Sequence, residues 1–187
     1  LPREGSGVDA LSDQQRARLR KLGVRIGAID LFMPAMLKPA ALAAWRALQA
    51  ARGQDLPPPV PNMPVVVPLP GKTRVPPGYR AVGNQAIRID MAEKLLLAVH
   101  GVRAARSRRI FAIDPAMAIS MGLTVDGHAR LLRQAGFSPV PTIALPAKAF
   151  GPPAPQRWRW HPGKKAVAPV PPPPGGGAFA ALAQLVR

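Results

Sequence analysis

The sequence has no cysteine, and aspartate and glutamate together number only 9 among 187 residues. The absence of cysteine excludes disulfide bonds, thiolate zinc sites and a cysteine nucleophile. It also fits a reducing compartment, so we expect a cytoplasmic protein. No apolar run is long enough to span a bilayer, so we expect no membrane partner. The chain begins at Leu1 with neither a signal peptide nor an initiator methionine, as a fragment of a longer protein would.

The shortage of acidic residues leaves a large positive charge. Lysine and arginine number 26, which gives a formal net charge of +17 and a sequence pI near 11.9. A charge of this size repels itself in the folded state, and a polyanionic partner relieves that repulsion. RNA or DNA is the partner we expect, because each phosphate contact releases counterions. An anionic membrane is disfavoured because no basic amphipathic helix stands out, and simple solubility is the remaining alternative.

Motifs that carry chemistry are also missing. The triplet Gly71–Thr73 resembles the end of a phosphate-binding loop, but Val66 stands where that loop needs its first glycine. The prolines that follow, beginning at Pro76, prevent the helix that must receive the phosphates. The histidines are scattered without the spacing of a zinc site, and there is no glycine-flanked serine elbow. We therefore expect no catalytic site, metal or cofactor within this chain.

Proline and glycine divide the chain into stretches. The 25 prolines and 17 glycines are unevenly spread, which predicts both folded and low-complexity segments. The predicted organisation is a disordered start at 1–10, a helical unit at 11–53, a Pro-rich linker at 54–77, a winged-helix-like domain at 78–160, a low-complexity linker at 161–177 and a short C-terminal helix at 178–187. The predicted fold class is mainly α with short β, in which Pro-rich linkers join the units.

In the first unit, the pattern predicts two helices with short extended segments between them. The segment Ser12–Gln15 has the form of a capping box, and the helix that it begins should end at Gly23. Apolar and polar residues alternate on both sides of Gly27, which indicates short strands. Pro39 is well suited to the first turn of the second helix.

The second unit has the pattern of a winged helix-turn-helix domain. The dipeptide Gly83–Asn84 predicts a hairpin turn, and Asp90 with Glu93 has the form of a capping box at the start of a long helix. The segments 114–122 and 124–136 predict a helix-turn-helix pair, and two extended segments follow. Three helices followed by two strands is the order of a winged helix, although a small helical bundle with a loose tail predicts a similar pattern.

The candidate contacts with nucleic acid are basic side chains, because arginine and lysine neutralise phosphates. One cluster follows the long helix, and a second lies on the later helix of the helix-turn-helix pair, beside His128 and Gln134. A third alternates with tryptophan in a C-terminal strand, where Trp158 and Trp160 either pack in the core or stack on unpaired bases. The predicted contact residues are Arg103, Arg106, Arg108, Arg109, Arg130, Arg133, Arg157, Trp158 and Arg159.

Several segments are similar to those of a known family. They are Leu22–Gly27 with Leu31–Pro39, Gly78–Gly83 with Ala86–Glu93, Asp114–Ala118, Leu132–Phe137 and Phe179–Ala183. Together they resemble the C-terminal region of bacterial superfamily-two helicases related to the mitochondrial degradosome RNA helicase. One departure is at the start of the helix after Thr124, where the family tends to have an acidic pair and this chain has Gly127 and His128.

The resemblance implies a nucleic-acid-binding accessory region that follows an ATP-dependent helicase core. That core would bind ATP and magnesium upstream of Leu1, and since none of its motifs lies here, no catalytic residue is carried over. The expected partners are RNA or DNA and the helicase core itself. The alternative is a protein-interaction module that recruits a nuclease or a ribosomal partner through the proline tracts and the terminal helix.

Overall fold

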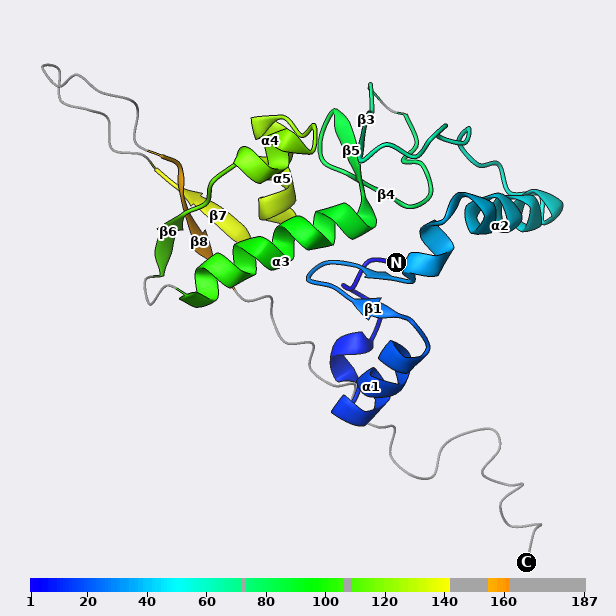
Figure 1. The fold of residues 1–187 in the computed structure, drawn as a ribbon, viewed down its shortest axis with the longest axis horizontal. Helices are drawn as coiled ribbons and strands as arrows, with labels where there is room; N and C mark the ends of the chain where they lie inside the picture. Colours follow the sequence, from blue (N-terminus) through cyan, green and yellow to red (C-terminus); the bar gives the residue numbers. More distant parts are fainter. Residues whose placement is uncertain (72, 106–108, 142–154, 162–187) are drawn as a thin grey trace, which may run out of the picture.

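The computed structural model describes residues 1–71, 73–105, 109–141 and 155–161 (Figure 1). The N-terminal elements are the 3-10 helix η1 (Val8–Ala10), α1 (Asp13–Lys21), β1 (Arg25–Ile26), β2 (Leu31–Phe32), the 3-10 helix η2 (Pro34–Leu37) and α2 (Pro39–Ala51). They are followed by β3 (Val66–Pro68), β4 (Tyr79–Ala81), β5 (Gln85–Arg88), α3 (Ile89–Ala105), β6 (Ile110–Ala112), α4 (Ala116–Ser120), α5 (Val125–Gln134), β7 (Phe137–Val140) and β8 (Arg157–Trp160). The long helix α3 runs through the middle of the molecule, from β3–β5 at one end to β6–β8 at the other.

The predicted mainly α class is wrong. Of the described residues, 42% are helical and 19% lie in strands, which form three small antiparallel sheets. The described chain is therefore mixed α/β. The strands are so short that alternation within each of them is a weak signal, and they become sheets only by pairing with partners elsewhere in the chain.

The first ten residues, predicted to be disordered, are part of the fold. The ammonium group of Leu1 donates to the carbonyl oxygen of Leu31 at 3.0 Å, and the guanidinium of Arg3 donates to the carbonyl oxygen of Gly27 at 2.9 Å. Val8 is only 1% exposed. Burial and hydrogen bonding together offset the entropy that the segment loses when it becomes ordered.

Part of the predicted linker at 54–77 is a strand. β3 is an edge strand of the sheet β3-β5-β4, and its Val67 lies opposite Ala86 of β5. The side chains of Val67 and Leu69 are buried. Pro68 is tolerated because β3 has only one neighbour, so the missing N–H of proline can point away from the sheet. The segment therefore packs as part of the second unit, and it also connects the first unit to the second.

The C-terminal sheet has the antiparallel order β6-β8-β7. β6 lies between α3 and α4, so the predicted order of three helices followed by two strands lacks one strand. Its Phe111 is paired with Trp158 of β8, which is the central strand of the sheet. α4 and α5 lie within the segments predicted as helices at 114–122 and 124–136, and the hydroxyl of Thr124 caps α5 by accepting the N–H of Gly127 at 3.0 Å.

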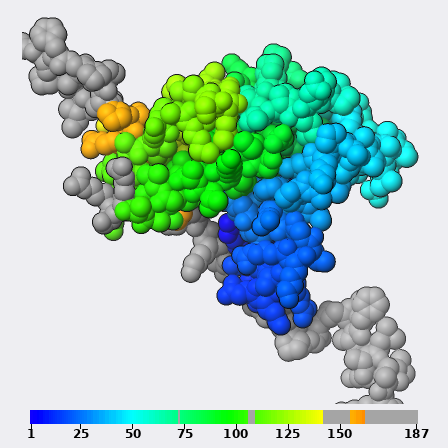
Figure 2. Space-filling model, in the orientation of Figure 1, coloured from blue at the N-terminus to red at the C-terminus, as the bar shows by residue number. Residues whose placement is uncertain are grey.

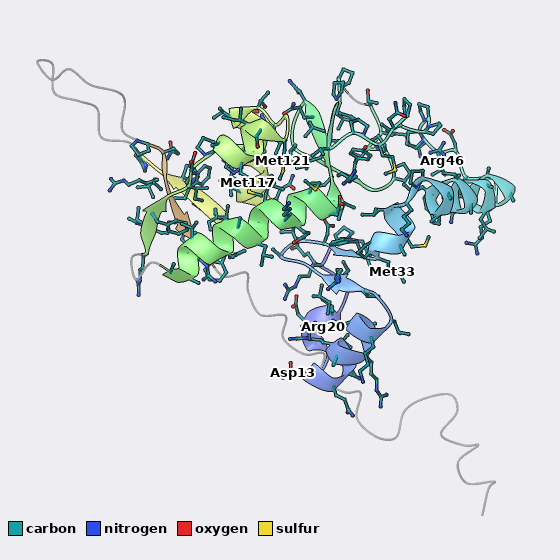
Figure 3. All side chains as sticks on the ribbon, viewed as in Figure 1. Asp13, Arg20, Met33, Arg46, Met117 and Met121 are labelled. Carbon is teal, nitrogen blue, oxygen red and sulfur yellow. The ribbon has the colours of Figure 1, made fainter. Side chains whose placement is uncertain are left out.

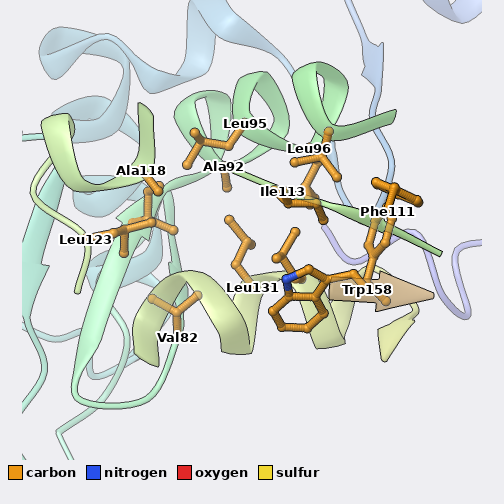
Figure 4. Packing of buried hydrophobic residues seen from close by; sticks show 14 residues of the cluster. Val82, Ala92, Leu95, Leu96, Phe111, Ile113, Ala118, Leu123, Leu131 and Trp158 are labelled. Atoms are coloured by element: carbon orange, nitrogen blue, oxygen red, sulfur yellow. The ribbon is translucent and has the colours of Figure 1, made fainter. Parts of the chain in front are cut away.

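The hydrophobic core lies between α3, α5 and the C-terminal sheet (Figure 4). α3 contributes Leu95 and Leu96, α5 contributes Leu131, and the sheet contributes Phe111 and Trp158. Full burial of a side chain of this size contributes about 1.5–3 kcal/mol. This cluster therefore fixes β8 against α3, which determines the faces on which the basic residues of β8 lie.

The loop between β1 and β2 docks the N-terminal elements on α3. The carboxylate of Glu93, 8% exposed, accepts three backbone N–H groups, from Ala28 at 2.5 Å, Ile29 at 2.9 Å and Asp30 at 2.7 Å. The capping box predicted for Glu93 and Asp90 is therefore wrong. A carboxylate that accepts three N–H groups satisfies donors that would otherwise be buried without a partner.

A buried ion pair strengthens the same contact. Asp30, 2% exposed, accepts two hydrogen bonds from the guanidinium of Arg80 in β4, at 2.5 and 2.7 Å. In the space-filling view the N-terminal elements, in blue, project from the main body, to which these contacts hold them (Figure 2).

Across the described residues, every helix is too short or too polar to cross a membrane.

Candidate nucleic-acid interface

Every acidic side chain of the protein belongs to the described residues, so each carboxylate can be placed. The salt bridges among these residues are Arg3–Asp9, Arg16–Asp13, Arg74–Asp55, Arg80–Asp30, Arg88–Asp90 and Arg130–Asp126. No acidic residue follows Asp126 in the sequence. All charged side chains beyond that position are therefore positive at neutral pH.

Basic side chains gather where the end of α3 meets the sheet β6-β8-β7. Arg103 lies in the last turn of α3, Arg109 directly precedes β6, and β8 carries Arg157 and Arg159. They meet because Ile110, the residue after Arg109, pairs with Arg159 in the sheet. Within the described ranges, none of these guanidinium groups lies within salt-bridge distance of a carboxylate. We call this set the cationic end.

The two faces of β8 differ in character, as the alternation predicted. Arg157 and Arg159 are exposed, whereas Trp158 is buried and Trp160 is half-buried against α3. Residues two apart on a strand lie about 7 Å from each other. The open face of the sheet therefore carries two neighbouring positive charges on its central strand.

The structure does not support the stacking role predicted for Trp158. This side chain is 5% exposed and packs in the core, so a base could reach its ring only if the core opened. The cause is that β8 is a central strand covered by α3 on one face, which makes core residues of those that point toward α3. The predicted contacts Arg106 and Arg108 lie outside the described residues.

The second tryptophan of β8 was not among the predicted site residues. The Cζ atom of Arg103 lies 4.0 Å from the centroid of the Trp160 ring. The ring of His100 meets the same indole edge to face, with 5.8 Å between centroids. The sequence did contain a signal, since Trp160 lies two residues beyond Trp158, but the partner on α3 could not be inferred from it.

α5 offers fewer contacts than predicted. Arg130 donates to Asp126 at 2.7 Å, one helical turn away, and its side chain lies against Gly83 of the β4–β5 turn. His128 is 5% exposed rather than on the outer face, and burial lowers the pKa of its imidazole. Arg133 is exposed and takes part in no salt bridge of the described chain. It is the α5 residue best placed to meet a phosphate.

The β4–β5 hairpin occupies part of the surface that a helix-turn-helix protein would use. The side-chain amide of Gln85 donates to the carbonyl oxygen of Gly122 at 3.0 Å. Its oxygen accepts both the N–H and the hydroxyl of Thr124 at 2.9 Å, and Gln134 donates to Ala81 at 2.8 Å. In helix-turn-helix proteins, the first turn of the second helix, here α5, ordinarily enters the major groove of DNA. These contacts favour the cationic end over α5 as the interface.

A second basic surface lies on α1, in a different part of the molecule (Figure 3). Arg18, Arg20 and Lys21 are exposed there, and none of them forms a salt bridge within the described ranges. α1 buries none of its own residues, so this is the ordinary pattern of a solvated helix face. These cations were not among the predicted contacts, although the run of basic residues is visible in the sequence.

The charges at the cationic end are those of guanidinium groups. Among the residues that the structure places, no three His, Asp or Glu side chains come together as metal ligands. Burial and the nearby charge of Arg103 lower the pKa of His100, so its imidazole is neutral at pH 7. The cations of this end therefore come from arginine, whose guanidinium stays charged throughout the physiological range.

Comparisons with protein-family models, with curated proteins and with solved structures give no match. The resemblance to helicases is therefore carried by the sequence segments alone. What the described residues offer to a functional argument is the cationic end, with its exposed arginines and its lack of acidic partners.

Proposed function

We propose that this protein binds RNA or DNA through the cationic end. Following the helicase resemblance, we further propose that it is an accessory region of an ATP-dependent helicase in the cytoplasm. The cationic end would hold the strand by its phosphates while the upstream core, with its own ATP and magnesium, moves that strand. Neither cofactor has a role in this chain under the proposal.

One observation carries the proposal: Arg157 and Arg159 lie two residues apart on the exposed face of β8, and Arg109 precedes the residue that pairs with Arg159. Among the described residues, no carboxylate lies within salt-bridge distance of them. Like charges in such proximity repel each other and destabilise the fold. A phosphate backbone relieves this repulsion and adds charge-assisted hydrogen bonds. The nine acidic residues are instead used elsewhere, chiefly on other arginines.

The test is the salt dependence of binding. We expect the logarithm of the association constant for a fluorescently labelled single-stranded oligonucleotide to fall linearly with the logarithm of salt concentration between about 50 and 200 mM. If four phosphates are contacted, the slope is about −3. Exchange of Arg157 and Arg159 together for alanine should make the slope shallower by about one to two.

Arg20→Ala is the matched control, since it removes one charge from α1 and should leave most of the slope intact. Binding that does not change with salt would contradict the proposal, as would equal losses from the α1 variant and from the two β8 changes taken singly. In that case the protein-interaction module that recruits a nuclease or a ribosomal partner would be the better function.

A further inference from the structure

The cationic end contains a flat aromatic surface with a cation over it. Trp160 is half-buried, and the guanidinium carbon of Arg103 lies 4.0 Å from the centroid of its ring. His100 meets the same ring at an interplanar angle of 88°, and it also contacts Phe137, with 5.2 Å between ring centroids. The indole is thus held in place from one side by packed rings, and its position does not depend on a ligand.

Arg103 is incompletely satisfied in this position. Its Nε atom is buried and has no hydrogen-bond partner, and no carboxylate of the protein reaches its guanidinium in the described structure. A buried donor without an acceptor costs free energy. Arg103 is thus held over Trp160 without a carboxylate to neutralise its charge, so that charge is available to an anionic ligand.

The chemistry of this pair fits one kind of ligand. Unpaired bases stack on aromatic rings and on the planes of guanidinium groups, and they carry acceptor atoms at their edges. A phosphate attached to the same nucleotide would meet Arg109, which directly precedes β6 at the end of β8 that carries Trp160. Bases within a duplex have both faces covered by neighbours, so they cannot use such a surface unless they are unstacked.

We propose that Arg103 and Trp160 form a stacking site for one unpaired base, so that the protein prefers single-stranded RNA or DNA to a duplex. This inference rests on the proposed nucleic-acid binding, and it names the class of strand that is bound. The arginines of β8 supply phosphate contacts common to both kinds of strand. Stacking on Arg103 and Trp160 adds binding free energy that only a strand with unpaired bases gains.

The experiment compares a labelled oligo(dT) with a labelled DNA duplex in the whole chain. Trp160→Ala should weaken binding of oligo(dT) about five-fold or more and leave duplex binding within about two-fold. Trp160→Phe, which keeps a ring, should restore most of the loss. Trp45→Ala, on α2 and away from the cationic end, is the matched control and should change neither affinity.

Arg103→Lys tests the same site without removing core volume, so it remains informative if Trp160→Ala fails to fold. The charge is kept and the plane is lost, and we expect an effect of about two- to five-fold on oligo(dT) alone. Circular dichroism and the urea midpoint of each variant confirm that it is folded.

The outcomes separate the two proposals. If neither strand loses affinity when Arg157 and Arg159 are both replaced by alanine, nucleic-acid binding at the cationic end is wrong. If that double variant loses affinity for both strands while Arg103→Lys behaves like the unchanged protein and Trp160→Ala has no strand-specific effect, the stacking site is wrong and the binding stands. Equal losses on oligo(dT) and duplex from Trp160→Ala also overturn the stacking site.

Discussion

Two glycines show how much a single position depends on its surroundings. A Cβ atom on Gly27 would clash with the carboxylate of Glu93, whereas a Cβ on Gly101 of α3 would meet nothing within 4 Å. Gly27→Ala should therefore displace Glu93 from its three N–H partners and lower the free energy of unfolding by about 3 kcal/mol. Urea unfolding followed by circular dichroism measures the change.

Gly101→Ala is the matched control for Gly27→Ala. It adds the same methyl group in the interior of a helix with open space around it, and alanine is preferred to glycine there by up to about 1 kcal/mol. The two substitutions should thus have opposite signs. A loss of stability from both, or no loss from Gly27→Ala, would show that the fit of Glu93 to the β1–β2 loop is looser than the structure indicates.

A buried histidine makes stability depend on pH. Burial lowers the pKa of His128 below its ordinary value of 6.5. As pH falls through 6.5, the unfolded chain binds a proton that the folded chain does not, so the free energy of unfolding decreases toward acid. The slope contributed by one histidine is at most about 1.4 kcal/mol per pH unit.

The measurement compares the urea midpoint of unfolding at about neutral pH with the midpoint at a pH about one unit below the ordinary histidine pKa of 6.5. His128→Gln should reduce the loss of stability toward acid. His100→Gln should act in the same direction, because burial and Arg103 also lower the pKa of His100. If His128→Gln leaves the pH dependence unchanged, protonation of this residue is not what destabilises the fold.

Among the elements, substitutions in β8 and in α5 should have different effects on the affinity for nucleic acid. Arg130 of α5 is held by Asp126 and lies against the hairpin, whereas Arg159 of β8 is exposed and forms no salt bridge in the described chain. We expect Arg159→Ala to weaken oligonucleotide binding by about three- to ten-fold and Arg130→Ala by less than about two-fold. Fluorescence anisotropy at low salt measures both. The reverse order would place the interface on α5.

Elements whose signals are local could be predicted from the sequence. Ser12 and Gln15 form both halves of the predicted capping box, Pro39 begins α2, and Gly83 takes the positive φ of 84° that the hairpin turn requires. Each of these signals acts between residues close in the chain. They are therefore visible without any knowledge of the tertiary structure.

β3 and β6 were missed because their signals are not local. β3 contains Pro68 and lies among prolines, and it is a strand only because β5 pairs with it. β6 follows a basic cluster and has three residues, with Phe111 as its buried member. Strand propensity over so few residues is weak, and pairing across long stretches of chain decides the outcome. The mainly α prediction was wrong for the same reason.

The candidate site could be predicted in part. Composition identifies the excess of positive charge, and alternation in β8 places Arg157 and Arg159 on one face. The sequence cannot show that Trp158 is covered by α3, nor that Arg103 lies over Trp160, because both facts depend on how α3 packs against the sheet. Of the two tryptophans weighed for stacking, the sequence therefore favoured Trp158, which lies in the core.

At the scale of the whole molecule, apolar contacts build the core, whereas the positions of the few acidic residues determine where positive charge remains. The core joins α3, α5 and the sheet through apolar contacts. Two acidic residues, Glu93 and Asp30, join the N-terminal elements to the rest of the chain, and most of the others pair with arginines near them in the sequence. With the acids committed to these contacts, the opposite end keeps its positive charge, and the same allocation stabilises the fold and leaves a surface for a polyanion.

If Glu93 joins the two parts, the whole chain should unfold in one step. Fluorescence of a Trp45→Phe variant reports on β8 alone, through Trp158 and Trp160, whereas far-UV circular dichroism also reports on the N-terminal helices. We expect the two urea transitions of this variant to coincide. Adding Glu93→Ala removes the acceptor of three backbone N–H groups, which should cost about 3 kcal/mol and separate the transitions. Adding Glu4→Ala, at an exposed carboxylate, should leave them coincident. Transitions that are separate before any change at Glu93, or that stay together at an unaltered midpoint after it, would mean that the β1–β2 loop does not couple the N-terminal elements to α3.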